Sequence, residues 1–199
     1  RRAMRPCQAV TRVGRVVGVA REITDHGSPD RFVAGTIGMP GERTFYLQSR
    51  SGMQTVTVVL EKEQVALLAE KLAEMLEEVA RIDPAGQAEP DVPVDMEPLE
   101  LPVIEAFRVG AFGIGWDTGS HQVVLEIHAV SEGSDVPDIG DDDADGPATL
   151  RVWLGAGAAR AFSKRAQSLV AAGRPPCPFC HLPLDPGGHI CPRANGYRR

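Results

Sequence analysis

Apolar residues in the first half of the chain follow two different periods. Three segments, "RFVAGTIG", "RTFYLQS" and "QTVTVVLE", lie between residues 31 and 61 and are rich in β-branched and aromatic residues, which favour strands. A Pro-Gly turn, "MPGER", joins the first two segments, and "SRSGM" supplies a glycine-bearing hairpin between the second and third. The pattern therefore predicts three consecutive strands joined by short turns.

The spacing then changes to that of a helix. In "EKEQVALLAEKLAEMLEEVAR" apolar residues recur at three- and four-residue steps, which places them on one stripe of a helix. Glu61 and Glu63 lie near its start, where carboxylates suit the helix dipole. The stripe that we expect to face the sheet consists of Val65, Leu68, Leu72, Met75, Leu76 and Val79.

The second half repeats this order. Strand patterns in "FRVGAFGIGWD", "HQVVLEIHAVS" and "TLRVWL" precede a helical pattern in "GAGAARAFSKRAQSLVAAG", with Gly173 as its C-cap. An acidic, proline-rich segment, "IDPAGQAEPDVPVDMEPLELP", separates the halves and predicts an irregular linker. A second acidic segment, "EGSDVPDIGDDDADGP", predicts a mobile, solvated loop.

The two halves also match residue by residue. Phe32-x-x-Gly-x-x-Gly38 matches Phe107-x-x-Gly-x-x-Gly113, and residues 55–60 match residues 149–154 at an offset of 94. The helix stripes follow at the same offset, although two amphipathic strand–helix segments can also resemble each other by chance. We expect an α+β fold, in which a duplicated β-β-β-α unit forms a mostly antiparallel sheet of about six strands with two helices on one face.

This pattern divides the chain into three parts. We expect residues 1–18 to form a flexible or mis-started extension, and an Arg-rich targeting segment is the alternative. We expect residues 19–173 to form the core. Its two repeats, at about 30–81 and 104–173, are separated by a linker at 82–103. We expect residues 174–199 to form a small zinc-binding tail.

Charge is distributed unevenly along the chain. The net charge is −6, but residues 1–21 carry six arginines and no acid, and residues 160–199 carry seven basic residues and one acid. Residues 22–159 hold 8 basic and 26 acidic residues, for a net charge of −18. An acidic body between basic ends argues against nucleic-acid binding by the whole domain. No apolar run is long enough for a membrane span, and clustered cysteines favour a reduced, cytoplasmic location over a disulfide framework.

The tail "CPFCHLPLDPGGHICPRANGYRR" has the spacing of a metal site. Cys177 and Cys180 are separated by two residues, so one turn can aim both thiolates at one ion, and His189 and Cys191 offer a second pair. Four such ligands with no vacancy predict a structural, tetrahedral Zn²⁺ site. His181 is an alternative ligand that needs a tighter loop. A Cys177–Cys180 redox pair leaves the second pair unexplained, and an iron–sulfur cluster normally uses four cysteines.

Other signals for function are weaker. Arg160, just after Gly157 at a helix start, is a candidate anion contact, although the G-x-G-x-x-G fingerprint is incomplete. Glu126 and His128 share one strand face as a possible acid–base pair, which half-exposed strands also carry routinely. The remaining candidate contacts for phosphate or an acidic partner are the tail residues Arg174, Arg193, Arg198 and Arg199.

Several segments together resemble a known family. "DRFVAGTIGMPGERTFYLQ", "LEKEQVALLAEKL", "EAFRVG" and "GRPPCPFCHLPLDPGGHICPRANGYRR" are similar to the actinobacterial family called domain of unknown function 3090, from about Val19 to Arg199. The resemblance carries over no catalytic residue. Its members tend to be encoded beside a histidine-phosphatase-like and a phosphoinositide-kinase-like protein, which implies, by analogy, a shared pathway with protein partners.

Three functions remain open at the level of sequence, of which nucleic-acid binding through the basic tail is disfavoured by the acidic body. The leading hypothesis is a non-catalytic, cytoplasmic zinc-binding scaffold or adaptor, because no catalytic motif is present and the metal site is closed. The alternative is an enzyme or binding protein for a phosphorylated small molecule, with arginines holding the phosphate. A deep cleft lined by His128, Glu126 or Arg151 would favour the alternative.

Overall fold

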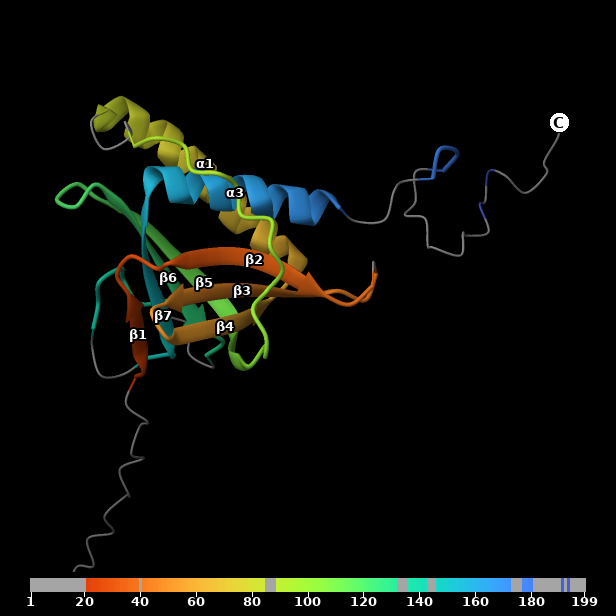
Figure 1. The fold of residues 1–199 in the computed structure, drawn as a ribbon, viewed down its shortest axis with the longest axis horizontal. Helices are drawn as coiled ribbons and strands as arrows, with labels where there is room; N and C mark the ends of the chain where they lie inside the picture. The colour runs from red at the N-terminus through yellow and green to blue at the C-terminus, as the bar shows by residue number, and fades with distance from the viewer. Residues whose placement is uncertain are drawn as a thin grey trace, which may run out of the picture.

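The computed structural model describes residues 21–39, 41–84, 89–131, 136–142, 146–172, 177–180, 191 and 193. Its centre is one seven-stranded sheet with two helices on one face, which confirms the predicted α+β class (Figure 1). The strands are β1 (Ile23–His26), β2 (Arg31–Ile37), β3 (Thr44–Ser51), β4 (Gln54–Leu60), β5 (Glu105–Asp117), β6 (Gln122–Ala129) and β7 (Thr149–Gly155). The helices are α1 (Lys62–Ile82) and α3 (Ala156–Ala171).

The strand order is β1-β7-β6-β5-β4-β3-β2. Two antiparallel meanders, β2-β3-β4 and β5-β6-β7, are joined by a parallel pairing of β4 with β5. The sheet is therefore mostly antiparallel, as predicted, but it has one strand more than the six expected. Sequence reasoning missed β1, "ITDH", because four residues with three polar side chains show no strand period; β1 pairs in parallel with β7.

The two edge strands of this sheet are neighbours in the sequence. In a flat seven-stranded sheet the edges would lie about 29 Å apart, at about 4.8 Å per strand. His26 ends β1 and Arg31 begins β2, and five residue steps span at most about 18 Å. The sheet therefore curls strongly, and the ring Nδ1 of His26 lies 2.8 Å from Ser49 Oγ of β3, across the opening between the two edges.

The helices fill the concave side of the curled sheet. α1 begins with a capping box formed by Glu61 and Gln64, and α3 packs along α1, as Figure 1 shows. The predicted stripe of α1 is buried, except that Met75 is only partly buried. Side chains from both meanders and both helices form one core, in which the rings of Phe32 and Phe162 lie 4.7 Å apart. Sharing one core explains why neither half has a closed core of its own.

The sheet register changes one part of the repeat comparison. At the offset of 94 that relates β4 to β7, the cross-strand pairs equate Phe32 with Phe112 and Gly35 with Gly115. The sequence comparison had instead matched Phe32 with Phe107. The two meanders thus share an order of elements, while the duplication itself stays a prediction.

The linker between the halves is irregular, as expected, and its described part is docked on the body. We call residues 89–104 the acidic strap; in Figure 1 it passes in yellow-green over α3 and around β2. Asp95 accepts hydrogen bonds from Arg31 of β2, at 2.7 Å, and pairs with Arg165 of α3. Arg165 Nε also donates to the free carbonyl of Ala34, at 2.7 Å. Strap and helix together cover the β2 edge, which would otherwise be open to another strand.

The strap continues over the outer face of the sheet, the face turned away from the helices. Leu99 packs there in a small apolar cluster with Val33, Tyr46, Val59 and the partly buried Val103. A Cβ atom on Gly35 would lie 2.5 Å from Leu99 Cγ, so glycine is what allows Leu99 to approach the backbone. The strap therefore acts as the outer cover of β2-β3-β4.

The second acidic loop covers the outer face of the other meander. Ile139 lies over Gly113 and Gly115, where added Cβ atoms would stand 2.9 and 3.2 Å from its side chain. Asp142 pairs with Arg151 of β7 at 2.6 Å. Most of residues 136–142 are exposed to solvent, and the loop touches the sheet through Ile139, for which glycines in β5 leave room. Neither described helix combines the length and apolar content that a membrane span requires.

Candidate functional sites

Three cysteines meet in the tail. The Sγ atoms of Cys177, Cys180 and Cys191 all lie within 4.8 Å of one another, and Cys177 and Cys191 are buried. Cys177 Sγ and Cys191 Sγ are 3.8 Å apart, far beyond a disulfide bond. Tetrahedral zinc with bonds of about 2.3 Å holds neighbouring sulfurs about 3.8 Å apart. The described thiols therefore have both the chemistry and the spacing for a thiolate-bound metal ion.

The backbone prepares Cys177 as a ligand. The turn at Cys177–Cys180 directs the Phe179 N–H towards Cys177 Sγ at 3.4 Å. Burial raises the pKa of the Cys177 thiol, but hydrogen bonds from the Cys180 and Phe179 backbone and from the two neighbouring thiols lower it below its ordinary value overall. Such N–H···S contacts stabilise the thiolate, which is the form that binds metal.

Of the other residues predicted to act in the tail, the structure describes Arg193 alone. Arg193 Nη1 donates to the Phe179 carbonyl at 3.4 Å, which ties the segment around Cys191 to the Cys177 turn. The other predicted tail residues lie outside the described residues, namely His189 as fourth ligand, His181 as its alternative, and Arg174, Arg198 and Arg199 as anion contacts. The structure thus brings together three of the four predicted metal ligands.

Arg160 lies where sequence analysis placed an anion contact, at the start of α3. Its Nε donates to Asp91 at 2.6 Å and its Nη2 to the Glu89 carbonyl at 2.6 Å. The Gly157 N–H donates to the Glu89 carboxylate at 3.0 Å. Arg160 lowers the pKa of Asp91, with a further contribution from Lys164. The anion at this helix start is therefore supplied by the acidic strap.

A buried polar cluster lies on the outer face of β6 and β7. Glu126 Oε1 accepts from Arg151 Nε at 2.6 Å and from the Gly140 N–H at 3.0 Å. Glu126 and His128 are 0% and 1% exposed, so both are removed from water. Sequence reasoning placed Glu126 and His128 on one face but missed Thr149 and Asp142. Thr149 and Arg151 flank Leu150 in the sequence, and this alternation of polar and apolar residues could have placed Thr149 on the same strand face as Arg151.

The hydrogen bonds around His128 favour one tautomer of its ring. Thr149 Oγ1 donates to the Pro147 carbonyl at 3.0 Å and accepts from Arg21 at 3.2 Å, so its single proton is used. All three contacts of Thr149 Oγ1 are satisfied together when His128 Nδ1, 3.0 Å away, is the donor. Burial lowers the pKa of His128, with Glu126 opposing and Arg21 and Arg151 adding to the shift. The neutral ring consequently carries its lone pair on Nε2.

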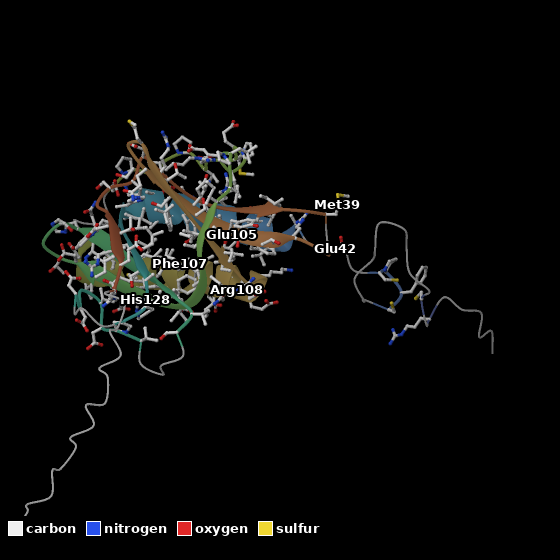
Figure 2. The ribbon with its side chains drawn as sticks, turned by 90° about the horizontal axis from the view of Figure 1, so that it is seen from below. Met39, Glu42, Glu105, Phe107, Arg108 and His128 are labelled. Atoms are coloured by element: carbon white, nitrogen blue, oxygen red, sulfur yellow. The ribbon has the colours of Figure 1, made fainter. Side chains whose placement is uncertain are left out.

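A cavity of about 380 Å³ adjoins this histidine. Its walls come from β5, from the end of β6 and from the covering loop, as the labelled His128 helps to locate in Figure 2. The described residues that line it are Val109, Gly110, Ala111, His128, Ala129, Val130, Ser131, Val136, Pro137 and Pro147. The space lies outside the shared core and touches His128, while Glu126 and Arg151 do not line it.

Comparisons with known proteins agree with the resemblance seen in the sequence. No curated protein and no solved structure matches the chain. A family model described as "Protein of unknown function (DUF3090)" matches residues 24–191. The matched span includes both meanders, both helices and the three clustered cysteines, and so the chain belongs to the DUF3090 family.

Proposed function

We propose that the protein is a zinc-binding scaffold or adaptor. The observation that carries this proposal is the tail cluster, in which three thiols lie within 4.8 Å of one another around a turn whose backbone faces a sulfur. His189, two residues before Cys191, supplies the fourth ligand in this proposal. A closed Cys₃His site gives the metal a structural role, because no coordination position is left for a substrate.

The zinc lobe presents the basic tail to a partner. Arg193 already contacts the lobe backbone, and Arg198 and Arg199 follow it in the sequence. Such a tail suits an acidic surface or a phosphorylated group on another protein. The kinase-like and phosphatase-like proteins implied by the family resemblance are the partners to test first. Reduced, metal-bound cysteines are consistent with a cytoplasmic location.

Metal content of the purified protein tests the proposal directly. Elemental analysis should find about one zinc per chain, because one Cys₃His set binds one ion. Cys177→Ser should lose the metal, whereas Cys7→Ser, outside the cluster, should keep it. Comparing the zinc content of His189→Ala with that of His181→Ala identifies the fourth ligand. A protein that contains no metal and yet keeps a folded tail would refute the zinc site.

The phosphorylated-ligand alternative has weaker support. Its best candidate in the core, Arg160, is engaged by Asp91 and the Glu89 carbonyl. A phosphate would have to displace these contacts before it could bind. Calorimetry with inorganic phosphate distinguishes this alternative from protein binding.

A further inference from the structure

Two buried acceptor atoms face each other beside the cavity. Glu126 Oε2 and His128 Nε2 are 3.6 Å apart, and neither makes a hydrogen bond within the described residues. In the tautomer that satisfies every contact of Thr149, both facing atoms present lone pairs. A buried acceptor without a donor costs free energy, so this arrangement lacks one group, a hydrogen-bond donor.

The fold itself does not require this arrangement. At the same register in the other meander, Gln48 and Thr57 occupy the places of Glu126 and Arg151. The Gln48 amide is fully bonded, donating to Thr57 Oγ1 and to the Glu100 carbonyl and accepting from the Glu100 N–H. An outer face of this sheet can therefore be covered without an unpaired acceptor.

The adjoining cavity defines what kind of group could supply the donor. Among the described residues that line it, His128 has the one titratable side chain, and the other walls are mostly Val, Ala and Pro. Arg151 already pairs with Glu126 and Asp142, so it is not available to an anionic ligand. Apolar walls with one convergent polar group are typical of sites for small organic molecules.

We propose that this cavity binds a small, neutral, mostly apolar molecule whose single hydroxyl or N–H group donates to His128 Nε2. Nε2 has almost no accessible surface, so the donor reaches it only when the cavity wall adjusts. This site is independent of the zinc cluster, and neither depends on the other being correct.

A matched pair of probes tests the site in the unmodified protein. Phenol carries one hydroxyl donor, and anisole has nearly the same shape without it. Imidazole ¹⁵N spectra during titration should show phenol shifting the Nε2 resonance of His128 in a saturable way. Anisole should bind about tenfold more weakly, because one hydrogen bond typically contributes that factor. His26 is equally buried and does not line this cavity, so its resonance is the internal control.

Variants give a second, independent reading. Thr149→Val removes the group that holds the Nδ1 tautomer and should reduce the preference for phenol, while Ser163→Ala, buried on α3, should leave it unchanged. Equal binding of the two probes, or no shift with either, would overturn the proposal. A spectrum with both His128 nitrogens protonated at neutral pH would also overturn it, because the pair would already share a proton.

Discussion

The outer faces of the two meanders are both covered by an irregular acidic segment, but the side chains beneath the two covers differ in chemistry. Over β2-β3-β4, the strap inserts Leu99 into an apolar cluster and satisfies Gln48 with backbone groups. Over β5-β6-β7, the loop inserts Ile139 but leaves a charged pair, Glu126 and Arg151, beneath it. The difference lies in depth: the ion pairs of the first face lie at its rim, partly exposed, whereas the second face buries Glu126 and most of Arg151 beneath its cover.

The largest difference should appear when the buried pair is broken. Arg151→Leu leaves Glu126 buried without its cation, and we expect a loss of about 3–5 kcal/mol in unfolding free energy. Arg50→Leu, which removes the more exposed pair with Glu100 on the other face, should cost about 1 kcal/mol or less. Urea unfolding measures both. Equal losses would mean that the two faces do not differ as described.

The apolar cover offers the second test. Leu99→Ala should cost about 2–4 kcal/mol by leaving a cavity, and Gly35→Ala about 1–3 kcal/mol by overpacking against Leu99. In the double variant the new methyl group fills part of the space, so the combined loss should be smaller than the sum. A double-mutant cycle in urea detects this coupling, and strict additivity would contradict the contact.

Exchanging the polar side-chain pairs between the two faces tests whether the fold needs the buried charges. Glu126→Gln with Arg151→Thr places the neutral pair of the first face at the same register in the second. Because the double variant leaves no unpaired buried charge, we expect it to lose less stability than Arg151→Leu. Thermal unfolding of the single and double variants provides the measurement. A double variant as unstable as the single one would show that the fold needs the charges.

The smallest effect concerns pH. Burial lowers the pKa of His128, so the unfolded chain takes up this proton at a higher pH than the folded chain. Stability from this group is complete above its ordinary pKa of about 6.5 and falls as pH drops towards the folded value. The slope is at most about 1.4 kcal/mol per pH unit.

His128→Gln should remove this slope while His26, whose pKa burial also lowers, keeps its own. Unfolding free energies at several values between pH 7 and 5 measure the difference. Unchanged pH dependence in His128→Gln would indicate that Glu126, Arg151 and Arg21 already compensate for the proton on this ring.

Local periodicity was sufficient to predict most of the architecture. Alternation of apolar residues located six strands, and the stripe from Val65 to Val79 located a helix, because both depend on neighbours in the sequence. β1 was missed because its pairing with β7 involves residues more than a hundred positions away. The docking of the strap was missed for a similar reason, since its acidic composition is also that of a free linker.

The candidate sites divide in the same way. Cysteine spacing predicts a metal site because short turns fix the ligand positions, and three of those ligands do meet in the structure. The His128 site depends on three distant segments, which bring Thr149, Gly140 and the cavity wall to one strand. No local pattern contains that information, although Glu126 and His128 were visible as polar positions.

The parallel pairing of β1 with β7 has a consequence for the protein during its synthesis. Ile23 pairs with Thr149, so the first strand to leave the ribosome waits for its neighbour while 126 further residues are made. At about 5–20 residues per second, this wait lasts on the order of ten seconds. The nascent chain must carry β1 unpaired throughout that time, and a chaperone that binds extended segments would find it there.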